Sequence, residues 1–326
     1  MAERVLKGSD RMKIVMTDCQ TITKGDLDLS AFDALGEVVI YNLTPKDKIH
    51  ERIKDADAVI CNKTVLNESN LKNTNVKYIG LFATGYNNID TEYCKENGIT
   101  VCNAGSYSTE AVAQHTFAFI LNYFNKIQKY TDFVKDGGWK TSETFSPFVF
   151  PLSELKGKTI GIIGFGKIGR EVAKIARAFS MNVKVHTRTK KDAEGVEFVS
   201  FDELVSTSDV VTVHCPLNAQ SEKMFTKNVF AKFKKDALFI NTARGGVINE
   251  QDLIDALNND IIGGAGIDVL EEEPMNADSK LPEAKNVMIT PHIAWAPIET
   301  RNRVVKVASD NLRNYINGTP TNVVNL

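Results

Sequence analysis

The sequence predicts an α/β protein of two domains, each built on a parallel sheet covered by helices. Three observations support this fold class. Short apolar runs bounded by Asp, Asn or Gly alternate with stretches of helical periodicity. The alternation occurs in two separate series, in the first hundred residues and again from residue 158. A chain of 326 residues also exceeds the size that one core usually serves.

The first series predicts an α/β domain with five strands, at 12–18, 37–42, 57–62, 76–81 and 99–103. The intervening segment 45–56 has helical periodicity, and alternating strands and helices favour a parallel sheet. A single long amphipathic helix is expected over 108–131, because apolar residues recur there every three or four positions. The stretch 136–158 is rich in Gly, Pro and Ser and indicates an irregular surface connection.

The second series predicts a doubly wound parallel sheet of six strands, at 158–164, 183–187, 210–215, 237–242, 264–269 and 286–290. The helical tail over 299–320 has no new strand series after it, so we expect it to pack on the first domain. The predicted domains are therefore 1–105 plus 296–326, and 106–295. Two chain crossings are typical of a hinge beside a cleft.

Composition excludes several classes of function. A net charge of −2 and 25% charged residues provide no electrostatic footprint for nucleic acid or an anionic membrane. The N-terminus lacks the apolar run of a signal peptide, and no apolar stretch is long enough to span a bilayer. The five cysteines are scattered, with no CxxC or Cys/His cluster. We therefore expect reduced thiols in a cytoplasmic protein without a metal site.

A glycine-rich turn predicts a bound dinucleotide. Residues 164–169 read Gly-Phe-Gly-Lys-Ile-Gly, directly after an apolar strand and directly before an amphipathic helix. Gly164 permits the tight turn, Gly166 lets the pyrophosphate approach the backbone, and Gly169 lets the helix pack against the strand. The amides of the first helical turn and the helix dipole then hold the phosphates.

The residues after the second strand of this domain favour NADP over NAD, although NAD stays possible. NAD-binding domains usually place an acid there to accept a hydrogen bond from the ribose 2′-hydroxyl. This chain has Thr187 and Arg188, followed by Lys190 and Lys191. A hydroxyl and a guanidinium suit a 2′-phosphate, which a carboxylate would repel. The alternative is an exposed basic turn without a ligand.

Three residues that follow the glycine turn indicate chemistry on a 2-oxo acid. Arg244 comes just after a strand, and its planar fork can bind a carboxylate while polarising the neighbouring carbonyl. His292 also follows a strand, and Glu273 can hold one imidazole nitrogen so that the other exchanges a proton with substrate. Taken alone, Arg244 also fits a surface ion pair, and Glu273 also fits a solvated acidic loop without a catalytic role. Structural roles are expected for His50, His115, His186 and His214.

The chain resembles the D-isomer-specific 2-hydroxyacid dehydrogenases over nearly its whole length. The resemblance is carried by stretches 80–90, 164–169, 214–217, 241–246, 266–274 and 290–295. It implies a Rossmann-type doubly wound sheet inserted into a flavodoxin-like α/β substrate domain. Within the family, stretches 83–90, 107–115 and 291–295 look most like the glycerate dehydrogenases, also called hydroxypyruvate reductases.

The resemblance also implies roles for individual residues. Arg244 would bind and polarise the substrate, His292 would be the acid/base and Glu273 its partner, while the Thr84 and Gly85 amides would hold the substrate carboxylate. Asp268 would face the nicotinamide carboxamide. The other residues expected at the cofactor are Phe165, Lys167, Ile168, Cys215, Pro216, Leu217, Thr242, Ala243 and Ala294.

The resemblance implies a homodimer formed through the long helix and the irregular segment, with Trp139 near the partner's site. The expected activity is NAD(P)-dependent reduction of hydroxypyruvate or glyoxylate. Two alternatives stay open: a dehydrogenase for another 2-oxo acid, such as 2-ketogluconate or an aryl pyruvate, or a non-catalytic dinucleotide-sensing protein. A formate dehydrogenase is disfavoured, because its site replaces the glutamate.

Overall fold

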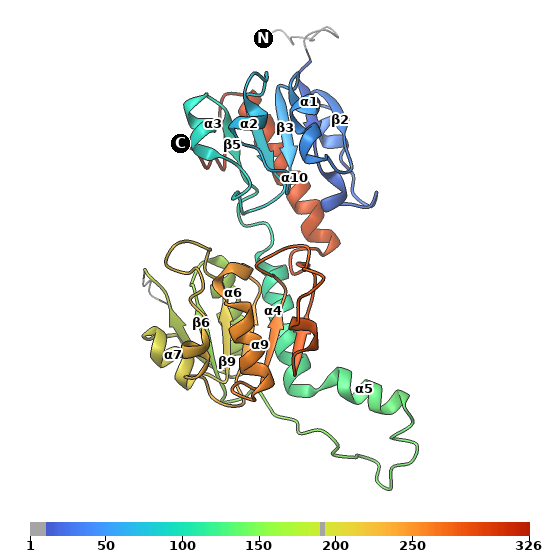
Figure 1. Cartoon of the computed structure of the whole chain (residues 1–326), viewed down its shortest axis with the longest axis vertical. Coiled ribbons are helices and arrows are strands. Elements are labelled where there is room, and N and C mark those ends of the chain that lie inside the picture. Colours follow the sequence, from blue (N-terminus) through green and yellow to red (C-terminus); the bar gives the residue numbers. More distant parts are fainter. Residues whose placement is uncertain (1–10, 190–192) are drawn as a thin grey trace. The chain divides into compact units, whose positions relative to one another are not determined.

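The computed structural model describes residues 11–189 and 193–326, and the chain divides into two compact units (Figure 1). One unit contains Met1–Ser108 and Ala296–Leu326, and the other contains Thr109–Trp295. The second unit is thus one continuous stretch of chain between two parts of the first. Both units are α/β with parallel sheets, which confirms the predicted fold class.

The first unit has a five-stranded sheet in the order β2-β1-β3-β4-β5, with every pair parallel. This is the flavodoxin-like order. The central strands are buried on both faces because their residues are almost all apolar, whereas β2 lies at an edge and is partly exposed. The strands are β1 (Lys13–Met16), β2 (Glu37–Ile40), β3 (Ala58–Cys61), β4 (Tyr78–Leu81) and β5 (Thr100–Cys102).

Short helices connect these strands, and the C-terminal helix returns to them. The α-helices are α1 (Ile49–Ile53), α2 (Glu68–Leu71), α3 (Thr91–Glu96) and α10 (Ile298–Ile316), and the 3-10 helices are η1 (Cys19–Thr21), η2 (Ser30–Phe32) and η3 (Lys46–Lys48). After α10 the chain pairs with the sheet edge, where the Val324 amide donates to the Val101 carbonyl over 2.9 Å. The tail therefore completes the first unit.

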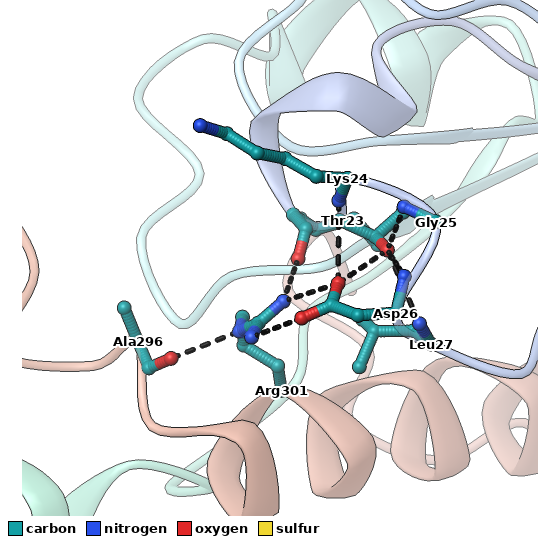
Figure 2. A network of polar contacts seen from close by, with 8 residues as sticks. Thr23, Lys24, Gly25, Asp26, Leu27, Ala296 and Arg301 are labelled. Carbon is teal, nitrogen blue, oxygen red and sulfur yellow. Dashed lines mark hydrogen bonds and ion pairs between the residues drawn. The ribbon is translucent and has the colours of Figure 1, made fainter.

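Arg301 fastens the start of α10 to the loop at residues 22–27 (Figure 2). Its guanidinium donates to both Asp26 carboxylate oxygens, over 2.9 and 2.7 Å, and to the Ala296 carbonyl over 2.9 Å. The guanidinium and the Thr23 hydroxyl hold the pKa of Asp26 well below its usual range. The first residue after the inserted unit is thus fixed to the body of the first unit.

The second unit has a seven-stranded sheet in the order β12-β11-β10-β9-β6-β7-β8. Numbered along this unit from β6 and read from β8 to β12, the order is 3-2-1-4-5-6-7, which is the doubly wound Rossmann arrangement. The strands are β6 (Thr159–Ile163), β7 (Asn182–His186), β8 (Glu197–Phe198), β9 (Val210–Val213), β10 (Leu238–Asn241), β11 (Gly264–Ile267) and β12 (Val287–Ile289). The prediction of six strands missed β8, because two residues are too short to form a periodic pattern.

The helix expected over 108–131 is two helices, α4 (Thr109–Asn125) and α5 (Ile127–Lys135). They are separated by Lys126, whose φ of 52° is left-handed and ends the helical hydrogen bonding. Within this unit, α5 and the segment after it project away from the sheet (Figure 1). The remaining helices are α6 (Lys167–Ala178), α7 (Phe201–Thr207), α8 (Lys227–Phe230), α9 (Glu250–Asn258), η4 (Gly245–Val247) and η5 (Leu281–Glu283).

Apolar side chains cover both faces of the seven-stranded sheet. One cluster joins α4 and α6 to β6 and β10 and includes Phe117, Ile120, Val172 and Ile240. A second cluster contains several aromatic residues, among them Phe225 and Phe239, and packs against α8 and α9. These cores make the sheet a rigid base for the loops at its edge. Over residues 11–189 and 193–326, no helix combines the length and apolar character that crossing a membrane requires.

Candidate functional site

The predicted residues of the second unit lie at the carboxyl edge of its parallel sheet. Gly164 follows β6, Cys215 follows β9 by two residues, Asp268 directly follows β11, and Thr290 directly follows β12. Strand order reverses between β6 and β9. In doubly wound sheets ligands bind outside the carboxyl ends of the strands at this reversal, so the edge is the expected cofactor crevice.

The glycine turn has the geometry that its sequence predicts. Gly164 has a φ of +91°, and a Cβ there would lie 2.7 Å from the Cys215 amide nitrogen. At Gly169 a Cβ would lie 2.2 Å from the Gly164 carbonyl oxygen, so only glycine lets α6 start this close to β6. Gly166 is the N-cap of α6 and is exposed, and nothing lies within 4 Å of a Cβ built on it.

This arrangement fits a dinucleotide. The space beside Gly166 lies in front of the first turn of α6, whose amides have no partner within the helix and carry the positive end of its dipole. Lys167 opens the helix on the exposed side, whereas Ile168 packs into the core and Phe165 stacks edge-on against Phe198. Of the six motif residues, these two apolar side chains thus hold the turn in place.

Thr187 and Arg188 follow β7, where a ribose-binding residue is expected. Thr187 is half-buried and Arg188 is exposed. Lys190 and Lys191, the two basic residues that follow in the sequence, lie outside the described residues. The described part of this turn therefore offers a hydroxyl and a cation.

The other residues expected at the cofactor lie in loops at the same edge. Thr242 is buried and Ala243 half-buried after β10, Pro216 is exposed after β9, and Ala294 is buried after β12. The Cys215 thiol is half-buried, and burial raises its pKa. It is therefore a neutral side chain at neutral pH rather than a reactive thiolate.

Arg244 is presented by a loop that Asn241 shapes. The Asn241 side chain is buried at the end of β10, donates to the Arg244 carbonyl over 2.8 Å, and accepts from the Ala243 amide over 3.0 Å. Gly245 follows, and a Cβ there would lie 1.8 Å from the Leu270 carbonyl carbon. The half-buried Arg244 side chain is thus held by a backbone that tolerates no bulk at the next position.

Glu273 and His292, predicted as a pair, are brought together by the fold. His292 Nδ1 lies 2.7 Å from Glu273 Oε2, and both side chains are partly exposed. The other oxygen, Glu273 Oε1, accepts from the Leu270 amide over 3.0 Å. Because an ionised carboxylate only accepts, Nδ1 carries a proton and Nε2 is the nitrogen left for proton exchange.

The backbone of His292 is in an unusual conformation. Its φ is +55°, the left-handed region, which costs an L-residue roughly 1–2 kcal/mol. Asp268 holds it there: the Asp268 carbonyl accepts from the His292 amide over 2.7 Å, and its carboxylate accepts from the Ile293 and Ala294 amides over 2.8 and 2.9 Å. The orientation of the His292 imidazole is therefore held both by the Glu273 contact at its ring and by the Asp268 hydrogen bonds at its backbone.

Two polar residues near this loop escaped the sequence reasoning. Thr290 donates its hydroxyl to Asp268 Oδ1 over 2.6 Å, and His115 Nε2 lies 2.9 Å from the same hydroxyl. The sequence predicts a structural role for His115, because it shows no obvious acid partner for this residue. A signal was available for Thr290, since it directly follows a strand two residues before the candidate acid.

The expected substrate residues Thr84 and Gly85 belong to the first unit and follow β4. The Thr84 side chain donates to the Gly105 carbonyl, and the Asn103 side chain donates to the Thr84 carbonyl over 2.7 Å. These contacts tie the 84–85 turn to the chain after β5. Across the described residues, no three His, Cys, Asp or Glu side chains gather as metal ligands would.

Comparisons with known proteins identify the family of this chain. Residues 117–294 match the model of the D-isomer specific 2-hydroxyacid dehydrogenase, NAD binding domain family. A hydroxypyruvate reductase of Blautia hydrogenotrophica is 41% identical over 321 residues, covering 96% of this chain and 100% of that protein. A glycerate dehydrogenase of Methylorubrum extorquens is 33% identical and covers 96% of this chain and 98% of that protein.

Among solved structures, an acyclic imino acid reductase in complex with NADPH and D-Arg has a TM-score of 0.86 at 31% identity. The match covers 96% of this chain and 100% of that one. The matched family model extends over more than half of the chain and over the whole carboxyl edge described above. The chain therefore belongs to the D-isomer-specific 2-hydroxyacid dehydrogenases, the NAD(P)-dependent oxidoreductases that interconvert 2-oxo acids and D-2-hydroxy acids.

Proposed function

We propose that this enzyme reduces hydroxypyruvate or glyoxylate, giving D-glycerate or glycolate, with His292 as the acid. The 2.7 Å contact between His292 Nδ1 and Glu273 Oε2 carries the proposal, because it leaves Nε2 to exchange a proton. The near full-length relative named hydroxypyruvate reductase supports the choice of substrate.

Each proposed residue has one task in the reaction. The Arg244 guanidinium binds the substrate carboxylate as a two-pronged donor and polarises the adjacent carbonyl. Thr84 and Gly85, in the first unit, are proposed to bind the substrate through their backbone amides. Protonated His292 then gives its Nε2 proton to the carbonyl oxygen, while the Glu273 carboxylate stabilises the imidazolium. In the reverse direction, neutral His292 removes the hydroxyl proton.

A nicotinamide cofactor, when bound at this edge, would supply the hydride for the reduction. We propose that the glycine turn at 164–169 holds its pyrophosphate, and that Cys215, Pro216, Thr242, Ala243, Asp268 and Ala294 surround the rest of the cofactor. The open space beside Gly166 and the loops at the carboxyl edge support this placement. No part of the proposed chemistry requires a metal ion.

The experiment that tests the proposed function is a panel of 2-oxo acids assayed with NADPH and NADH on the parent enzyme and His292→Gln. Hydroxypyruvate and glyoxylate should have the highest kcat/KM. The variant should lose roughly 10²–10⁴-fold in kcat while still binding cofactor. His50→Gln, at an exposed histidine of α1, is the matched control. Near-normal turnover by His292→Gln would contradict the role of His292 as the acid. A preference for 2-ketogluconate or an aryl pyruvate would contradict hydroxypyruvate or glyoxylate as the substrate.

We further propose that NADPH is the preferred cofactor. Support comes from the Thr187 hydroxyl and the exposed Arg188 guanidinium at the end of β7, where an acid would disfavour a 2′-phosphate. Arg188→Ala should lower kcat/KM for NADPH by roughly ten- to a hundred-fold, since an ionised hydrogen bond is worth roughly 1.5–3 kcal/mol. It should leave NADH nearly unchanged. A parent enzyme that prefers NADH would refute this proposal.

We also propose a homodimer that functions in the cytoplasm. The segment after α5 exposes Trp139, Phe145 and Phe148, which are 54, 92 and 89% accessible. Aromatic side chains so exposed on a projecting segment suit a protein partner, and a second copy is the one proposed. The five cysteines are free thiols, four of them buried, which is consistent with a reducing compartment.

A further inference from the structure

Three polar side chains from distant parts of the chain meet behind the loop that carries His292. Asp268 directly follows β11 and Thr290 directly follows β12. Because Ile267 and Ile289 are register partners in these parallel strands, Asp268 and Thr290 come next to each other at the sheet edge. His115 reaches them from the second turn of α4.

The hydrogen positions in this group follow from the chemistry of its members. Thr290 gives its only hydroxyl proton to Asp268 Oδ1, over 2.6 Å, so it can only accept from His115 Nε2, 2.9 Å away. His115 therefore carries its proton on Nε2. Burial lowers the pKa of His115, against the opposing effect of the Asp268 carboxylate, so the ring is neutral at neutral pH. The Phe119 ring packs edge-on against it.

The Asp268 carboxylate is the junction between this group and the His292 loop. Its side chain is fully buried and accepts three hydrogen bonds, from the Thr290 hydroxyl and from the amides of Ile293 and Ala294. The hydroxyl and the Ile293 amide share one oxygen, Oδ1. Removing the hydroxyl would leave the carboxylate free to turn, and its hold on the two amides would loosen.

We propose that Thr290 and His115 are positioning residues for the reaction: they lock the Asp268 carboxylate, which in turn keeps the strained 292–294 backbone in the conformation that aims His292. The proposal rests on the proposed role of His292 as the acid. The Thr290 hydroxyl bonds to the Asp268 carboxylate and His115 bonds to that hydroxyl, so the proposed effect of both side chains on His292 passes through Asp268.

The central test is the pair Thr290→Val and Thr290→Ser. Valine keeps the shape without the hydroxyl, and we expect kcat to fall about ten-fold or more, because small misplacements of a catalytic group are costly. KM for the 2-oxo acid should stay within about two-fold, since Arg244, the residue proposed to bind its carboxylate, is not changed. Serine restores the hydroxyl and should recover kcat to within about three-fold.

A deuterium isotope effect adds a measurement that a merely structural role would not move. With cofactor deuterated at the transferred position, the isotope effect on kcat should be larger for Thr290→Val than for the parent, because a misplaced acid slows the chemical step itself. An unchanged isotope effect with lower kcat would overturn the proposal. So would a loss confined to the dissociation constant of NADPH.

His115 is tested by His115→Leu and His115→Gln. Glutamine places an amide donor near the position of Nε2 and should largely restore the kcat that leucine loses. Thermal unfolding of each variant identifies any loss caused by failure to fold. If His292→Gln abolishes turnover while Thr290→Val and His115→Leu match the parent, the positioning role fails and the proposed acid stands. If His292→Gln stays active, the proposed acid itself fails.

Discussion

His214 shows how strongly single residues of this chain depend on their surroundings. It follows β9, its Nε2 lies 2.9 Å from the Thr212 hydroxyl, and its Nδ1 is buried without a hydrogen-bond partner among the described residues. Burial lowers the pKa of His214 to about 3. His292, by contrast, is partly exposed and paired with a carboxylate. The two imidazoles are therefore suited to different roles, a neutral structural group and a proton donor.

The low pKa of His214 predicts acid sensitivity of the fold. The unfolded chain binds a proton at this residue below about pH 6.5, and the folded protein does not until about pH 3. The free energy of unfolding should therefore fall by up to about 1.4 kcal/mol per pH unit in this window. His214→Gln removes this dependence, so its stability relative to the parent should improve from pH 7 to pH 5. Urea unfolding at each pH measures this, and parallel curves would contradict it.

Among the elements, the turn between β6 and α6 was the most predictable and the helix after residue 108 the least. Each glycine of the turn has a local steric reason that the motif already contains. Helical periodicity, however, continues through Lys126, where the chain adopts a left-handed conformation with its ammonium 3.9 Å from the Tyr123 ring centroid. The Tyr123 ring also packs against Gly263 and Gly264, and its hydroxyl donates to the Asp236 carbonyl over 3.2 Å. These long-range contacts at the end of α4 are not reported by any local pattern.

The second and third glycines of the turn, Gly166 and Gly169, should respond differently to a methyl group. Gly169→Ala puts a Cβ 2.2 Å from the Gly164 carbonyl oxygen and should lower both stability and cofactor affinity. Gly166→Ala meets nothing within 4 Å, and the φ of −75° there suits alanine. It should leave the melting temperature of the cofactor-free protein nearly unchanged and weaken NADPH binding about ten-fold or more. Equal affinity for NADPH in Gly166→Ala would contradict the placement of the pyrophosphate.

At the scale of the whole molecule, the C-terminal tail completes the sheet of the first unit, whereas the second unit is one continuous inserted stretch of chain. Arg301 secures the point where the chain re-enters the first unit, through the Ala296 carbonyl and Asp26 (Figure 2). The sequence showed that the tail is helical and follows the last strand, and from this we predicted its return to the first domain. The contacts that hold it there join residues 275 positions apart and needed the structure.

The exposed aromatic residues after α5 predict that the projecting segment carries the dimer contact. Phe145→Ser combined with Phe148→Ser should convert a dimer to a monomer in light scattering at micromolar protein, because the change removes large apolar surface from the contact. Leu43→Ser, at an exposed apolar residue of the first unit, is the matched control and should stay dimeric. A monomeric parent, or a dimeric double variant, would contradict the proposed contact.

The sequence by itself determined the two parallel sheets, the dinucleotide turn and the polar residues that follow β10, β11 and β12, because these depend on local periodicity and local sterics. The sequence predicts that Glu273 partners His292, and in the fold His292 Nδ1 lies 2.7 Å from Glu273 Oε2. Only the tertiary structure decided that Asp268 holds the left-handed backbone of His292 and that His115 and Thr290 support it. Those contacts depend on β11 lying beside β12 and on α4 packing along β11, with Phe119 against Gly266 and His115 near Asp268. Strand order is a long-range property that no local pattern encodes.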